Sequence, residues 1–135
     1  MYRISDSTLF IDNRKKIYGY LISRGVKDST YFDFIKNNKL GILEPNFCSV
    51  DGFDFGISHF FGISKVSGYD IITANKNLGT DEGNIVSIGL IEGDDVICLC
   101  TKNNEIFLRM INNGNGETIK VANSFEALLK LITME

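Results

Sequence analysis

The chain has 135 residues, of which 44% are hydrophobic, and a formal net charge of −3. A chain of this length predicts one domain, residues 1–135, with a sizeable core, and its mild acidity disfavours nucleic acids and anionic membranes as partners. With three cysteines, no apolar run of ~18 residues and no signal peptide, it is expected to be cytoplasmic with reduced thiols.

The N-terminal part of the sequence predicts a short strand and two helices. Residues 7–12 alternate in the manner of a strand, whereas residues 13–24 and 28–38 repeat apolar side chains at helical spacing. Gly25 stands where the first helix should end, and Asp28 or the serine after it is suited to cap the second. The side chains expected to face the core are Ile17, Tyr20, Leu21, Tyr31, Phe34 and Ile35.

The middle of the chain predicts loops around one strand and one short helix. Residues 41–56 contain the only proline, Pro45, and many Gly, Asn and Asp residues, which indicates an irregular loop. Residues 57–63 are apolar and β-prone, and residues 69–77 are typical of a short helix. A polar loop at residues 78–83 then leads into the last part of the chain.

The C-terminal third predicts a sheet closed by a helix. Apolar runs separated by short Gly- and Asn-containing turns predict four strands, at residues 84–91, 95–101, 105–111 and 117–122. The second run is apolar on both faces, so that strand should be central. Residues 123–133 return to helical spacing, with Asn123 as the expected N-cap and Glu126 completing a capping box. The expected fold is α+β, a mostly antiparallel meander with helices packed beside it.

Short motifs follow one another in a fixed order over most of the chain. The first is the helix that carries Tyr31, Phe34 and Ile35. The others are, in order, Phe60-Phe61-Gly62-Ile63, Ser87-Ile88-Gly89, Glu92-Gly93-Asp94, Ile97-Cys98-Leu99 and Val121-Ala122-Asn123-Ser124-Phe125-Glu126-Ala127-Leu128-Leu129. Together, over about residues 17–132, they resemble the SUKH superfamily of Smi/Knr-like domains. The chain departs from that family's pattern at the Leu-Pro start and Asn-Gly-Gly end of the first motif helix, and it lacks the hairpin tryptophan.

The resemblance implies a SUKH-like fold and a non-enzymatic binding domain. Bacterial members are mostly immunity proteins that neutralise polymorphic or contact-dependent toxins, often nucleases. We therefore expect an intracellular antitoxin that binds a protein toxin, with no cofactor and no direct contact with nucleic acid or membrane. The alternative is a Smi/Knr-type interaction module in signalling or cell-wall regulation. A third hypothesis is a hydrolase that uses paired carboxylates such as Asp94 and Glu44.

Acidic residues and two phenylalanines gather in the predicted loops. Taken singly, each carboxylate is a solvated turn residue, and Phe47 and Phe53 are as well explained by folding back onto the core. Taken together, they predict a negative rim with aromatic anchors, which would attract the basic surface of a nuclease. The predicted partner-contact residues are Glu44, Phe47, Asp51, Asp54, Asp81, Glu82, Glu92, Asp94 and Asp95.

Three other patterns are better explained by structure than by chemistry. His59 is the only histidine, and Ser58 beside it should point to the other face of a strand, which argues against a Ser-His pair. Cys98 and Cys100 share a strand face, but no further soft ligands stand at metal-binding spacing, so no metal site is expected. The glycines in residues 114–116 lie between predicted strands, whereas phosphate-binding glycine loops precede a helix.

Overall fold

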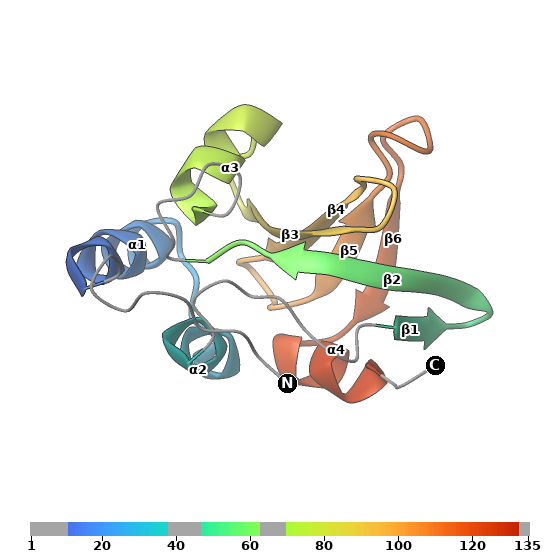
Figure 1. Ribbon diagram of the computed structural model, residues 1–135, viewed down its shortest axis with the longest axis horizontal. Coiled ribbons are helices and arrows are strands. Elements are labelled where there is room, and N and C mark those ends of the chain that lie inside the picture. The colour runs from blue at the N-terminus through green and yellow to red at the C-terminus, as the bar shows by residue number, and fades with distance from the viewer. Residues whose placement is uncertain (1–10, 38–46, 63–69, 133–135) are drawn as a thin grey trace.

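Six strands pair in the order in which they occur along the chain (Figure 1). The computed structural model describes residues 11–37, 47–62 and 70–132. The strands are β1 (Phe47–Val50), β2 (Phe53–Phe60), β3 (Ile85–Ile91), β4 (Val96–Cys100), β5 (Ile106–Arg109) and β6 (Thr118–Ala122). Every neighbouring pair is antiparallel, so the sheet is a meander, nearly closed into a barrel. The predicted single α+β domain with an antiparallel sheet is confirmed.

Helices cover the sheet on several sides (Figure 1). Those of the described residues are α1 (Ile11–Ser23), α2 (Ser29–Asn37), α3 (Ile71–Leu78) and α4 (Phe125–Leu131). Helix α3 packs against β3, and α1 packs against α3. Helix α4 contacts α2 and also both outer strands, β1 and β6. It therefore fills the space between the two edges of the sheet.

A cluster of aromatic rings joins the helices to the sheet. The ring centroid of Phe125, at the start of α4, lies 5.1 Å from those of Tyr31 and Phe34 in α2 and 5.4 Å from that of Phe60 in β2. All four side chains are buried, and the rings meet edge to face, which aromatic pairs favour. Phe125 thus ties three elements together.

One carboxylate caps two helices. Oδ1 of Asp28 accepts hydrogen bonds from the backbone N–H groups of Thr30 (3.0 Å) and Tyr31 (3.2 Å), at the start of α2. Its Oδ2 accepts from the backbone N–H of Phe125 (3.2 Å), the first residue of α4. These N–H groups have no partner within their own helices. The predicted cap of α2 is confirmed, and the same side chain also fixes the start of α4.

The predicted capping box at the start of α4 is wrong. Ser124, with φ −162° and ψ 168°, is the N-cap, and its side chain accepts from the backbone N–H of Ala127 (3.1 Å). Asn123 is exposed, and Glu126 instead forms an ion pair with Lys130 (3.2 Å). Ser124 lies one residue further from β6 than Asn123. It takes this role because its backbone has the extended conformation that an N-cap requires.

The predicted loop at residues 41–56 is wrong over its described part, since it contains β1 and the first half of β2. The two strands are joined by a tight turn at Asp51 (φ 50°) and Gly52 (φ 83°). An Asp-Gly pair between apolar runs is a strong hairpin signal, because both residues tolerate positive φ. Residues 11 and 12, predicted as part of a strand, begin α1, and residues 7–10 lie outside the described residues.

Two local predictions are confirmed. Gly25, with φ 93°, ends α1, and the N–H of Val26 bonds to the carbonyl of Leu21 (3.0 Å) across it, as in a glycine-terminated helix. Strand β4 is covered on both faces, because Val96 through Leu99 are at most 2% exposed.

Among the described residues, none of the helices has the length and apolar character needed to span a bilayer.

Candidate functional site

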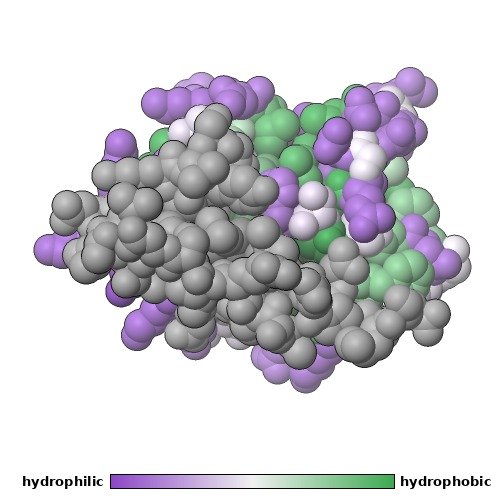
Figure 2. All heavy atoms as spheres, viewed as in Figure 1, coloured by the Kyte–Doolittle hydropathy of each residue, from purple (hydrophilic) through white to green (hydrophobic). Residues whose placement is uncertain are grey.

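A groove of about 560 Å³ opens beside the β1–β2 hairpin. The hairpin contributes Phe47, Phe53, Asp54, Phe55 and Gly56 to its lining. The end of β3 and the turn after it contribute Ile91, Glu92 and Asp95, and the β5–β6 connection contributes Met110 and Asn113. The described lining residues thus combine aromatic, apolar and acidic side chains and include no lysine or arginine. In Figure 2 this part of the molecule shows hydrophobic surface next to hydrophilic residues.

The carboxylate of Glu92 lies across Gly56 on the hairpin. The N–H of Glu92 donates to the carbonyl oxygen of Gly56 (2.7 Å), and a Cβ at Gly56 would lie only 2.8 Å from Cδ of Glu92. Phe47 is the cross-strand partner of Gly56, so the Phe47 side chain and this carboxylate share one face of the hairpin. Glycine at this position leaves the space that the carboxylate occupies.

Phe47 and Phe53 are both half-buried, so each packs on the protein and also reaches the groove. The ring of Phe53 lies 5.9 Å from that of the buried Phe55, with 35° between their planes. Asp54 lies between Phe53 and Phe55 in sequence, but its side chain is on the other face of the hairpin. It is exposed and accepts a hydrogen bond from the hydroxyl of Ser49 (2.5 Å). The ring that shares a face with the Asp54 carboxylate is that of Phe47, since Phe47↔Gly56 and Ser49↔Asp54 are cross-strand pairs two positions apart.

Asp95 is the buried carboxylate of the groove, with only 1% of its surface exposed. Its Oδ1 accepts from the backbone N–H groups of Asn112 (2.7 Å) and Asn113 (3.0 Å), and its Oδ2 accepts from the Asn113 side-chain amide (2.8 Å). Burial acts to raise the pKa of Asp95, but the hydrogen bonds from Asn113 and Asn112 outweigh it and hold the pKa below its ordinary value. The side-chain amides of Asn112 and Asn113 also donate hydrogen bonds to the carbonyl of Gly93 (2.7 and 2.8 Å). Asp95 thus fastens the β5–β6 loop to the β3–β4 turn.

The structure brings together four of the predicted contact residues, Phe47, Asp54, Glu92 and Asp95. Exposed neighbours flank the groove in two turns: Asp51 in the β1–β2 turn and Asp94, with φ 68°, in the β3–β4 turn. The others lie elsewhere. Asp81 and Glu82 are exposed in the loop after α3 and do not line the groove, and Glu44 lies outside the described residues.

Asn113 and Met110 are groove residues that sequence reasoning missed. Residues 112–116 read as a plain polar loop, and the only signal was the Asn-Asn pair, whose amides can bridge a carboxylate and a carbonyl. Which carboxylate they would bridge depends on how the two turns meet in space.

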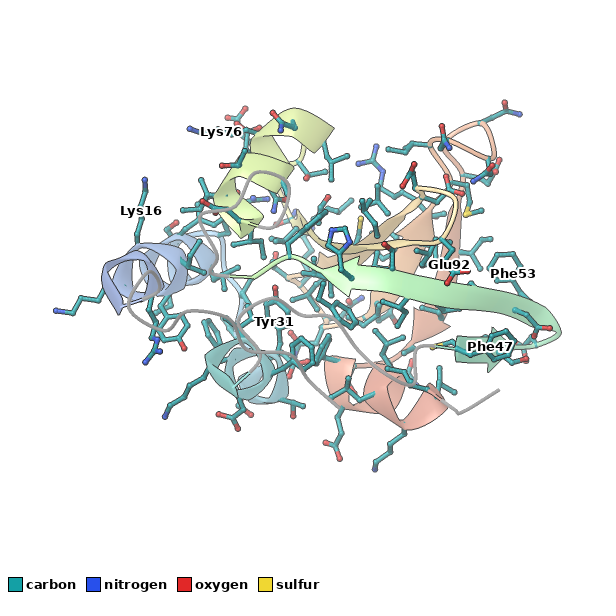
Figure 3. The ribbon with its side chains drawn as sticks, in the orientation of Figure 1. Lys16, Tyr31, Phe47, Phe53, Lys76 and Glu92 are labelled. Atoms are coloured by element: carbon teal, nitrogen blue, oxygen red, sulfur yellow. The ribbon has the colours of Figure 1, made fainter. Side chains whose placement is uncertain are left out.

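Two exposed lysines lie away from the groove. Lys16 in α1 and Lys76 in α3 are exposed, and Figure 3 shows them at one end of the molecule. Phe47, Phe53 and Glu92 lie at the other end in the same view. These two charges would repel a basic partner from that end of the molecule as it approaches.

Ser58 and His59 are closer than the sequence predicts. The Ser58 hydroxyl lies 3.1 Å from Nδ1 of His59, so the expected opposite orientation is wrong. The β2–β3 register shifts between Ile57 and His59, and such a bulge breaks the strict alternation of side chains along a strand. Neither residue lines the groove.

Two of the three cysteines behave as small apolar side chains. Cys48 and Cys98 are fully buried, and burial raises the pKa of each thiol to about 11, in the case of Cys98 against the hydrogen bond from Ser87 and the charge of Arg109. Both thiols are therefore protonated at neutral pH and weakly reactive. In the described part of the chain, no group of three His, Cys, Asp or Glu residues is placed to hold a metal ion.

Comparison of the chain with protein-family models, curated proteins and solved structures gave no match.

Proposed function

We propose that the chain is a non-enzymatic immunity protein of SUKH type, which binds a basic protein toxin such as a nuclease and blocks it. The groove carries this proposal, because it joins exposed carboxylates to partly exposed aromatic rings. Aromatic anchors supply most of the energy in many interfaces, and complementary charge raises the rate of association. The net charge of −3 and the exposed lysines at the far end agree with a basic partner.

The groove suits protein binding through its shape as well as its charge. It is formed by two β-turn regions and a hairpin, and the Asp95 hydrogen bonds hold the β5–β6 loop in place before any partner arrives. A surface ordered in advance loses less conformational entropy on binding. A rigid acidic groove can therefore capture a toxin without remodelling.

A charge-reversal experiment tests the site. The double variant Asp54→Lys/Glu92→Lys should slow association with the toxin at least about tenfold at low salt, because electrostatic steering contributes factors of this size. Asp81→Lys/Glu82→Lys makes the same change in net charge outside the groove and is the matched control. The probe is the protein encoded by the gene next to this one, and stopped-flow fluorescence measures the association rate.

Three outcomes are informative. Slowing by the groove variant alone, which disappears at high salt, supports the proposal, provided that co-expression of the wild-type chain rescues cells from the toxin. Equal slowing by both double variants would remove the groove assignment, because net charge alone would then explain the effect. A partner that binds the groove but is harmless to cells would favour the alternative, an interaction module in signalling or cell-wall regulation.

A further inference from the structure

We infer that the groove recognises an arginine side chain of its partner, held between the Glu92 and Asp54 carboxylates and the ring of Phe47. This inference rests on the proposed function and names the chemical group through which the toxin would be held. The space available is sufficient, because 560 Å³ lies within the range of about 300–1,000 Å³ that is usual for small-molecule sites.

Two of the three groove carboxylates are available to a cation. Asp95 is buried, and its two oxygens accept three hydrogen bonds from Asn112 and Asn113. Glu92 and Asp54 are exposed, and both reach the groove. The negative charge that a ligand can contact therefore lies on the hairpin and on the first residue after β3.

Aromatic surface adjoins this charge. Phe47 lies opposite Gly56 in the β1–β2 pair, and Glu92 lies across Gly56, so ring and carboxylate are neighbours on one face. Asp54 stands two residues before Gly56 in β2, so its side chain is on this same face, whereas Phe53 lies on the other face, half-buried against Phe55. A cation in the groove would therefore meet a carboxylate and a ring at the same time.

This combination favours a guanidinium group over an ammonium group. Guanidinium is planar, donates two parallel hydrogen bonds to a carboxylate, is weakly hydrated and stacks on aromatic rings. Lysine offers a compact, strongly hydrated charge that stacks less well. A trimethylated ammonium donates no hydrogen bonds and would use the Phe47 ring alone, so it would leave the carboxylates as simple charges.

The test uses blocked pentapeptides in which a central residue is flanked by two glycines on each side. The central residue is arginine, lysine, trimethyllysine or citrulline, which has nearly the shape of arginine without its charge. Each peptide is titrated into the isotopically labelled full chain, and amide shifts are followed by NMR. The arginine peptide should move the amides of Gly56, Glu92 and Asn113 and bind about two- to fivefold more tightly than the lysine peptide, the gain typical of one exposed cation–π contact.

Two variants separate the contributions. Phe47→Leu keeps apolar volume but removes the ring, so it should abolish the preference for arginine over lysine while a weak binding of both remains. Glu92→Gln removes the charge next to Gly56 and should weaken both peptides. Asp81→Asn, exposed outside the groove, is the control and should change neither. Unchanged amide shifts far from the groove establish that each variant is folded.

The inference is overturned if the lysine or trimethyllysine peptide binds as tightly as the arginine peptide, if citrulline binds equally well, or if the shifts lie outside the groove. Saturable binding of none of the peptides also overturns it. Failure of the proposed function would look different. A toxin whose association still depends on Asp54 and Glu92, with no arginine preference, refutes this inference alone, whereas arginine binding without any toxin partner refutes the immunity function alone.

Discussion

At the scale of single residues, two carboxylates three positions apart have opposite environments. Glu92 is exposed over Gly56, whereas Asp95 is buried under hydrogen bonds from Asn112 and Asn113. The difference follows from their places in the turn, since Asp95 is next to β4 and faces the β5–β6 loop. A residue of the acidic turn thus shapes the groove, and its predicted contact with a partner stays a prediction.

The lowered pKa of Asp95 predicts a specific pH dependence of stability. Because the folded pKa lies below the ordinary value of 3.8, Asp95 stabilises the fold fully above that pH, and this contribution is lost as the pH falls through the lower folded pKa. Asp95→Asn should cost about 1–3 kcal/mol at neutral pH, because an amide nitrogen cannot accept the hydrogen bond from the Asn113 amide. Urea unfolding at neutral pH and at acid pH measures both effects.

The neighbouring Asp94→Asn is the matched control for this prediction. Asp94 is exposed and has φ 68°, a conformation that asparagine tolerates well. The free energy of unfolding of the Asp94→Asn variant should stay within about 0.5 kcal/mol of that of the wild type. A stability difference between wild type and Asp95→Asn that does not shrink in acid would contradict the assignment to Asp95.

At the scale of elements, a side chain of α3 takes the place of a strand. Strand β2 ends at Phe60, before it would reach Ser87 of β3. There the amide of Asn75 donates to the Ser87 carbonyl (2.9 Å) and accepts from the Ser87 N–H (2.8 Å). It also donates to the Ile71 carbonyl (2.8 Å) and accepts from the Thr80 hydroxyl (2.7 Å). Buried and fully hydrogen-bonded, Asn75 fixes α3 on the sheet.

Asn75→Ala should lower the free energy of unfolding by about 2–4 kcal/mol, because the buried N–H and carbonyl of Ser87 both lose their partner. Asn77→Ala, on the exposed part of the same helix, should change it by no more than about 0.5 kcal/mol. Chemical denaturation of the two variants gives the comparison. Equal effects would show that Asn75 contributes no more than an exposed helix residue.

At the scale of the whole molecule, α4 completes the barrel. The sheet alone has two open edges, β1 and β6, and α4 contacts both while its first residue, Phe125, reaches into the aromatic cluster. Asp28 fixes the start of this helix from across the chain, through the 3.2 Å bond to the Phe125 N–H. Closure of the fold therefore depends on contacts between segments that are far apart in sequence.

Phe125→Ala should be the most destabilising single truncation in α4, at about 3–5 kcal/mol, because it empties the centre of the ring cluster. Leu129→Ala, at a half-buried position of α4, should cost clearly less, since its surroundings are partly solvated. Thermal and urea unfolding of the two variants measure the difference. A Phe125→Ala effect no larger than that of Leu129→Ala would contradict a central role for α4.

Sequence reasoning succeeded where local chemistry decides. Helix spacing and terminators such as Gly25, and the apolar runs of β3 to β6, were sufficient because each signal lies within a few neighbouring residues. The β1–β2 hairpin was missed although its Asp51-Gly52 turn is a local signal, because the segment's polar composition outweighed that signal in the interpretation. Half of the groove rests on that hairpin.

The sequence by itself determined an α+β domain, its antiparallel meander, its closing helix and the acidic character of its turns, because periodicity and turn residues act over short distances. Only the tertiary structure decided which of those acids meet in one groove, that Asp95 is used to hold a loop, that Asp28 caps a second helix, and that Asn75 replaces a strand. Each of these depends on hydrogen bonds between residues that the fold, and not their sequence separation, brings together.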